Sequence, residues 1–118
     1  MKNRRMLIII FIAVSGGFAD RIGPREEESH ILRSDRESVT LSCTYETTSR
    51  YIYLYWYRQN TQPQYILRKG ARSYRGYEDI PDDHFQSKTS DTSTELIIKS
   101  VSLSDSALYY CALRDEAQ

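Results

Sequence analysis

The sequence has few of the residues on which enzymes and metal sites depend. Among its 118 residues only two are histidine, His30 and His84, and only two are cysteine. It also lacks a glycine-rich phosphate loop, a Gly-x-Ser-x-Gly nucleophile motif, and a His or Cys pair at metal-ligand spacing. We therefore expect a protein that is not an enzyme and that holds no metal and no cofactor.

Net charge and long apolar runs are lacking as well. Lys plus Arg and Asp plus Glu number 16 each, so the bulk charge gives no reason to expect a nucleic-acid partner. No segment reaches the about 20 apolar residues that a membrane-spanning helix needs. We expect any attachment to a membrane to come from another chain or from further sequence.

The first 19 residues have the pattern of a secretory signal peptide. A basic head precedes the apolar run from Met6 to Val14, and the small residues Gly17 and Ala19 follow. This pattern predicts a signal peptide over residues 1–19, cleaved after Ala19, and one domain over residues 20–118. We therefore expect the chain to enter the secretory pathway.

Apolar and polar residues alternate with a period of two through most of that domain. The alternation predicts strands over residues 39–45, 53–59, 65–67, 95–99 and 107–112. A loop of mixed charge is expected over residues 68–83, and a short helical turn near Ser102. Many short strands predict an all-β sandwich, in which Leu96 faces the core.

The two cysteines, Cys43 and Cys111, are expected to form a disulfide, because an exported chain meets an oxidising lumen. A cross-link that closes a loop of 68 residues removes about 4 kcal/mol of chain entropy from the unfolded state. This contribution is comparable with the net stability of a small domain. We therefore assign the pair a structural role rather than a redox or metal-binding one.

Two aromatic residues stand at fixed distances from these cysteines. Trp56 lies thirteen residues after Cys43, and Tyr109 lies two residues before Cys111. This is the pattern of the immunoglobulin fold, in which the indole packs against a disulfide between the sheets. The pattern also predicts that the Tyr109 hydroxyl bonds to the backbone near Asp105.

Two strings, YLYWYRQ (Tyr53–Gln59) and LSDSALYYCALR (Leu103–Arg114), resemble T-cell receptor variable segments of the alpha or delta kind. The resemblance implies an immunoglobulin V-type domain that recognises antigen in adaptive immunity. In that family a joining segment supplies the last strand with a Phe-Gly-x-Gly turn, and no such turn follows Cys111. We therefore expect a V-type sandwich that lacks its last, joining-segment strand. A light-chain variable segment and an innate immune receptor ectodomain stay open as alternatives.

The resemblance also implies partners. Tyr57, Gln59 and Tyr110 match positions that face the variable domain of a beta or gamma chain. An outward row of aromatic rings beside one amide suits such an interface, because exposed contiguous aromatics need a cover. The implied ligand is a peptide on an MHC molecule or another antigen. Signalling subunits would associate through constant and transmembrane parts, which places the domain on the extracellular face of the plasma membrane.

The antigen-contacting loops of the family correspond to residues 47–53, residues 69–76 and the stretch that begins at Ala112. Their tyrosines and serines suit an antigen-binding surface, since tyrosine supplies stiff contact area and serine supplies adaptable hydrogen bonds. The contact residues implied by the resemblance are Arg50, Tyr51, Tyr53, Arg72, Tyr74, Leu113 and Arg114.

A basic cluster precedes an acidic one in the middle of the chain. The basic residues are Arg68, Lys69, Arg72 and Arg75, and the acidic residues are Glu78, Asp79, Asp82 and Asp83. A heparin or nucleic-acid patch is one interpretation. The favoured interpretation is solvated loops whose opposite charges partly neutralise one another. A third is that the basic residues orient the domain over acidic positions on an antigen-presenting surface.

His84 stands where the resembled family usually has an arginine that pairs with the aspartate of its Asp-Ser-Ala motif, Asp105 here. We expect either His84 or Arg58 to take this place beside Asp105. The expected role of His84 is structural and not catalytic.

Overall fold

The computed structural model describes residues 5–12, 21–24, 30–34, 36–59 and 62–116, and these residues form ten strands in two sheets. The strands are β1 (Arg5–Ile12), β2 (Arg21–Pro24), β3 (His30–Ser34), β4 (Val39–Glu46), β5 (Tyr51–Gln59), β6 (Pro63–Arg72), β7 (Glu78–Asp79), β8 (Phe85–Thr89), β9 (Ser93–Ile98) and β10 (Leu108–Asp115). A short 3₁₀ helix, η1 (Leu103–Asp105), precedes β10. The predicted all-β sandwich is confirmed.

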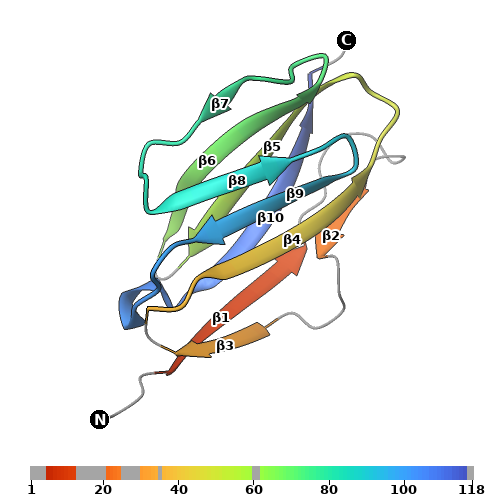
Figure 1. Cartoon of the computed structure of the whole chain (residues 1–118). Coiled ribbons are helices and arrows are strands. Elements are labelled where there is room, and N and C mark those ends of the chain that lie inside the picture. The colour runs from red at the N-terminus through yellow and green to blue at the C-terminus, as the bar shows by residue number, and fades with distance from the viewer. Residues whose placement is uncertain (1–4, 13–20, 25–29, 35, 60–61, 117–118) are drawn as a thin grey trace.

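The two sheets lie face to face (Figure 1). The strand order is β3-β1-β10-β5-β6-β7 in one sheet and β2-β4-β9-β8 in the other. Alternation decides which side chains enter the space between them. In β4 the residues Val39, Leu41, Cys43 and Tyr45 are buried, while the intervening residues are exposed or half-buried. A strand with one buried face requires this period of two.

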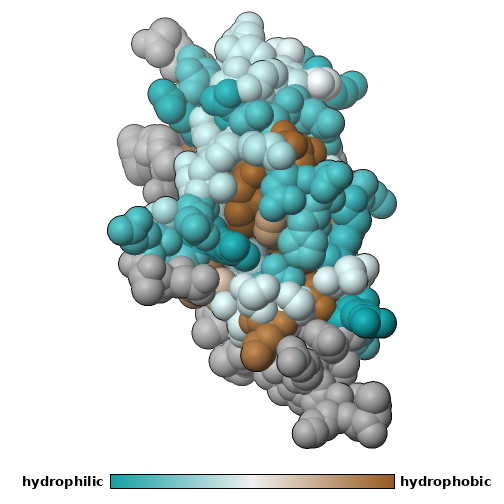
Figure 2. Space-filling model, turned by 90° about the vertical axis from the view of Figure 1, so that its left-hand side faces the viewer, coloured by the Kyte–Doolittle hydropathy of each residue, from teal (hydrophilic) through white to brown (hydrophobic). Residues whose placement is uncertain are grey.

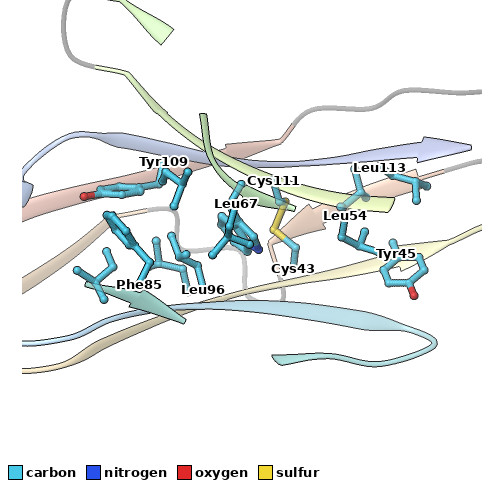
Figure 3. Packing of buried hydrophobic residues seen from close by; sticks show 14 of the residues in the cluster. Cys43, Tyr45, Leu54, Leu67, Phe85, Leu96, Tyr109, Cys111 and Leu113 are labelled. Carbon is cyan, nitrogen blue, oxygen red and sulfur yellow. A yellow bond between two sulfur atoms is a disulfide. The ribbon is translucent and has the colours of Figure 1, made fainter. Parts of the chain in front are cut away.

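A disulfide and an indole join the two sheets at the centre of the core (Figure 3). Cys43 on β4 is bonded to Cys111 on β10, with a Cα–Cα distance of 6.8 Å. Trp56 on β5 is fully buried, and its Nε1 donates a hydrogen bond to Oγ1 of Thr94 on β9 at 3.2 Å. Because a buried N–H needs an acceptor, Thr94 gives the indole a fixed position between the sheets.

Strand β6 is longer than the sequence indicates. It continues to Arg72, so the first part of the expected loop over residues 68–83 is strand. The register with β5 shifts between Trp56, opposite Leu67, and Tyr57, opposite Tyr65, which leaves Ile66 as an extra residue. This bulge lets Ile66 and Leu67 both be buried and turns the next side chain outward. A strict period of two does not reveal such a strand.

Strand β1 lies within the predicted signal peptide. In the structure of the whole chain it pairs in parallel with β10, with Ile12 opposite Cys111, and antiparallel with β3. The edge of β10 that faces away from β5 is therefore occupied by β1. Cleavage after Ala19 stays a prediction, and its expected position lies outside the described residues.

The surface on the side of β7 is mostly hydrophilic, with a small apolar strip in its middle (Figure 2). Within the described part of the chain, no helix has the length and apolar character to cross a membrane. Most of the tyrosine rings that contact one another lie on a different surface, the outward face of the sheet that contains β5.

Candidate functional site

The outward face of β5 and its neighbours carries a continuous series of tyrosine rings. Tyr57 stacks on Tyr110 of β10 with ring centroids 5.1 Å apart, and on Tyr55 at 6.0 Å. Tyr55 in turn meets the edge of Tyr53 at 6.4 Å. Tyr65 of β6 meets both Tyr55 and Tyr57 edge to face. We call these five residues (Tyr53, Tyr55, Tyr57, Tyr65 and Tyr110) the tyrosine face.

The residues expected to meet a partner domain lie at one end of this face. Tyr57, Gln59 and Tyr110 are all half-buried on adjacent strands, with Tyr57 directly opposite Tyr110 in the register. Burial raises the pKa of the Tyr57 hydroxyl. The structure therefore brings the two rings together and places Gln59 two residues beyond Tyr57 on the same face of β5.

Tyr74 extends the series of rings toward the other end of the sheet. It stacks on Tyr53 at 4.9 Å and meets Tyr51 edge to face at 5.7 Å. Gly70 permits this approach, because a Cβ at that position would lie 2.3 Å from the carbonyl oxygen of Tyr74. Tyr51, Tyr53 and Tyr74, three of the expected antigen-contact residues, thus form one cluster.

Three of the remaining expected contact residues, Arg50, Arg114 and Leu113, differ in their exposure to solvent. Arg50 is exposed at the start of β5, and Arg114 on β10 exposes 65% of its side chain and pairs with Glu116 at 2.7 Å. Leu113 is not on a loop: it lies in β10 and is fully buried. The structure thus places Leu113 in the core and not on the expected loop, because β10 continues three residues beyond the predicted end at Ala112.

Arg72 holds two loops together instead of extending into solvent. Its guanidinium donates to the carbonyl oxygens of Thr47, Ser49 and Asp91, each at 2.7 Å. Its backbone has a φ of 59°, which turns the chain sharply at the end of β6. The structure favours an internal role for Arg72 over contact with antigen, because its guanidinium already donates hydrogen bonds within the domain.

Other members of the basic cluster also have partners within the domain. Lys69 lies 3.5 Å from Glu78, and Arg75 lies 3.8 Å from Asp91. Both pairs are at least partly exposed, so each contributes little to stability. The Lys69–Glu78 pair joins the two clusters across strands β6 and β7, whereas Asp91 lies outside the acidic cluster.

Arg68 is the residue of this surface that the sequence interpretation missed. Its guanidinium lies 4.8 Å from the ring centroid of Tyr53 and 5.0 Å from that of Tyr77. It donates hydrogen bonds to the hydroxyls of Tyr55 and Tyr77. These hydrogen bonds raise the pKa of Arg68. The bulge at Ile66 is the reason that Arg68 faces outward, and the sequence gives no direct sign of it.

At the opposite end of the sandwich, Asp105 has more partners than the sequence interpretation considered. Nε2 of His84 lies 3.0 and 3.1 Å from its two carboxylate oxygens, and the guanidinium of Arg58 lies 3.7 Å away. The carboxylate also accepts the backbone N–H of Ser102 at 2.9 Å. Tyr109 donates its hydroxyl to the Asp105 carbonyl oxygen at 2.6 Å, the bond that the sequence predicts. His84 and Arg58 therefore share the place beside Asp105, and His84 is the closer.

Comparison with known proteins identifies the family to which this chain is similar. The immunoglobulin V-set domain model matches residues 26–118. The chain is 34% identical to human T cell receptor alpha variable 18 over 114 residues, which cover 92% of each sequence. It is 30% identical to human T cell receptor beta variable 13 over 112 residues, covering 93% of this chain and 89% of that protein.

The chain belongs to the immunoglobulin V-set family, among the T-cell receptor variable segments. This family recognises antigen and is not enzymatic, in agreement with the scarcity of catalytic residues in the sequence. A variable domain of this kind is an extracellular immunoglobulin domain. At 30–34% identity to the beta and alpha segments, the family assignment does not distinguish the two chain types.

A viral relative extends the same family. A T-cell receptor beta chain-like protein of feline leukemia virus is 32% identical over 114 residues, which cover 95% of this chain and 35% of that protein. The V-set domain is thus the part that the two share.

No group of three or more potential metal ligands occurs in the described part of the chain.

Proposed function

We propose that this chain is the variable domain of a T-cell receptor alpha or delta chain and that it pairs with the variable domain of a beta or gamma chain. The string Tyr-Trp-Tyr-Arg-Gln over Tyr55–Gln59 and the Ala-Leu pair after Cys111 favour the alpha or delta kind.

The observation that carries the pairing is the tyrosine face. Five packed rings cover one side of β5, β6 and β10. Tyr65 is the most exposed of the five, at 41% of its surface, and the other four are half-buried. Rings that are stiffened by mutual packing lose little entropy when a partner covers them. Beside them, the amide of Gln59 would supply one orienting hydrogen bond to the partner. This combination of aromatic area with a single polar group is typical of an interface core.

The cluster at the other end of the sheet supports antigen recognition. Tyr51, which is 46% exposed, packs against Tyr74, and Arg50 precedes it in the chain. We propose that these residues, with Tyr53 and Arg114, contact antigen, which for an alpha chain is a peptide on an MHC molecule. Leu113 and Arg72 act behind them, one in the core and one as the tie between loops.

Two further parts of the proposal depend on sequence beyond this domain. A joining segment would supply a strand for the edge of β10 once the signal peptide and its β1 are removed. Constant and transmembrane regions would anchor the receptor in the plasma membrane and recruit the signalling subunits. The edge of β10 supports the first of these, because an unpaired strand edge requires a cover.

The experiment is to join the chain to alpha-type or delta-type joining and constant regions and to co-express it with a beta or gamma chain in cells that lack a receptor. We expect surface display of the paired receptor, reduced at least several-fold by the double substitution Tyr57→Ala and Tyr110→Ala. Tyr51→Ala, outside the proposed interface, is the matched control and should leave display unchanged. Display only after fusion to beta-type regions, with an alpha chain as partner, would contradict the chain type proposed.

A further inference from the structure

Arg68 lies among the rings of the tyrosine face at a fixed position. Ring centroids of Tyr53, Tyr77 and Tyr55 lie 4.8, 5.0 and 5.8 Å from the guanidinium carbon. Hydrogen bonds to the hydroxyls of Tyr55 and Tyr77 fix the orientation of its plane. Arg68 is therefore a positioned cation, unlike a long side chain that moves freely in solvent.

This cation has no anionic partner within the described part of the chain. The ion pairs of the other basic side chains there include Lys69 with Glu78 and Arg58 with Asp105, but none involves Arg68. Asp79 lies opposite Arg68 in the β6–β7 register, yet it accepts a hydrogen bond from the Tyr65 hydroxyl. The Nε atom of Arg68 is shielded from solvent and has no hydrogen-bond acceptor among the described residues.

Covering this face with another protein would change the free energy of the charge. Removing an unpaired charge from water is strongly unfavourable. Contacts with aromatic rings recover only part of that cost, and the two hydroxyl hydrogen bonds are present before and after. A partner surface without an acid would therefore bind against a net penalty. A carboxylate removes the penalty, because the planar guanidinium can donate two parallel N–H groups to its two oxygens.

We propose that Arg68 receives the carboxylate of an aspartate or glutamate side chain from the partner variable domain, and that this pair selects among partner chains. The proposal rests on the proposed function, since it requires that the tyrosine face be covered by another variable domain. Partners with an acid opposite Arg68 pair tightly, and partners with a neutral or basic residue there pair weakly. Arg68 is thus a specificity residue of the interface, whereas the tyrosine rings supply the area.

The experiment compares Arg68→Glu, Arg68→Met and Arg68→Lys in the complete receptor chain. Each variant is co-expressed with a panel of beta and gamma chains, and the affinity of each purified pair is measured as a dissociation constant. For partners that the wild-type chain prefers, we expect Arg68→Glu to weaken pairing by roughly 30-fold or more, which is about 2 kcal/mol. Arg68→Met should weaken it less, and Arg68→Lys least, because lysine keeps the charge and loses the paired donors.

Two controls separate a lost contact from a lost fold. Lys88→Glu makes the same kind of charge change on an exposed residue of β8, in the other sheet, and should leave pairing unchanged. Thermal unfolding of each pair reports whether the Arg68 variants remain folded. The decisive step is reversal: an Asp→Lys or Glu→Lys substitution at one position of the partner should restore pairing with Arg68→Glu.

The outcomes distinguish this inference from the proposed function. If Arg68→Glu and Arg68→Met pair like wild type while Tyr57→Ala does not, the inference is overturned and the proposed function stands. If Arg68→Glu loses pairing but no acidic position of the partner restores it, the carboxylate is wrong. If the wild-type chain pairs with no beta or gamma chain, both fail.

Discussion

The two faces of β5 are made by alternate residues of one strand, yet their surroundings differ. On the inward face, Ile52, Leu54 and Trp56 are fully buried against the opposite sheet of the same domain. On the outward face, Tyr53, Tyr55 and Tyr57 are half-buried and touch mainly one another and their tyrosine neighbours. The same period of two therefore separates residues that make the fold from residues that offer a surface.

Residue type follows this separation. The inward side chains are aliphatic or have one polar atom that is satisfied inside, as Trp56 is by Thr94. The outward side chains of Tyr53, Tyr55 and Tyr57 are rings with a hydroxyl at the far end, which can lie against water or against a protein. We therefore expect substitutions on the inward face to change stability and substitutions on the outward face to change binding.

The largest expected effect is that of Trp56→Ala. Removing a fully buried indole between the sheets should lower the free energy of unfolding by about 3–5 kcal/mol. Tyr55→Ala, on the next residue of the same strand, should lower it by about 1 kcal/mol or less because its ring is only half-buried. Denaturant unfolding of the receptor ectodomain measures both. Equal losses from the two variants would remove the distinction between the faces.

Sequence alternation was sufficient to predict the inward face but not the whole of the outward one. The spacing of Cys43, Trp56, Tyr109 and Cys111 predicted the disulfide and the sandwich because these side chains must meet at the centre of the fold. Tyr53, Tyr55 and Tyr57 were visible as an aromatic row on one face. Strand β4 was predicted nearly to its ends, since its alternation is unbroken.

The failures have different physical causes, of which one is a local departure from a regular strand. The bulge at Ile66 interrupts the alternation, so neither the length of β6 nor the outward position of Arg68 could be predicted. Arg72 looked like a loop cation, and only the folded chain brings it to the carbonyls of Thr47 and Ser49. Leu113 looked like a loop residue because the family pattern gives no end for β10.

The second prediction uses Tyr45, an inward tyrosine whose hydroxyl donates to the carbonyl oxygen of Ser90 at 2.5 Å. Burial raises the pKa of Tyr45 to about 12, above its value near 10 in an unfolded chain. The stabilisation from the protonated phenol is therefore complete below pH 10 and is lost as the pH rises toward 12. A shift of about two pKa units corresponds to about 3 kcal/mol.

The matched variant is Tyr45→Phe, which cannot ionise. We expect wild type to exceed it in unfolding free energy by about 1 kcal/mol at neutral pH, and this advantage should shrink and then reverse between pH 10 and 12. Urea unfolding at a series of pH values gives the difference directly. An advantage that stays constant to pH 12 would contradict the raised pKa.

Tyr109 and Tyr110 offer the sharpest comparison, because they are adjacent tyrosines on opposite faces of β10. Tyr109 is fully buried and donates to the Asp105 carbonyl, whereas Tyr110 stacks on Tyr57. Tyr109→Phe leaves a buried carbonyl without that donor and should lower the unfolding free energy by about 1–2 kcal/mol. Tyr110→Phe keeps the ring and should change it by less than about 0.5 kcal/mol. A reversed order would show that the hydroxyl of Tyr109 is not what holds this corner.

The smallest expected effects concern the two cations beside Asp105. His84 lies 3.0 Å from the carboxylate and Arg58 lies 3.7 Å away, and both side chains are about a quarter to a third exposed, at 32% and 25%. His84→Ala removes the closer donor and should lower the unfolding free energy by about 1 kcal/mol, whereas Arg58→Met should lower it by about 0.5 kcal/mol. The double variant should lose more than the sum, because it removes both cations from a nearly buried carboxylate that keeps the Ser102 N–H as a donor. Additive losses would mean that the two cations act independently on Asp105, and that neither replaces the other when it is absent.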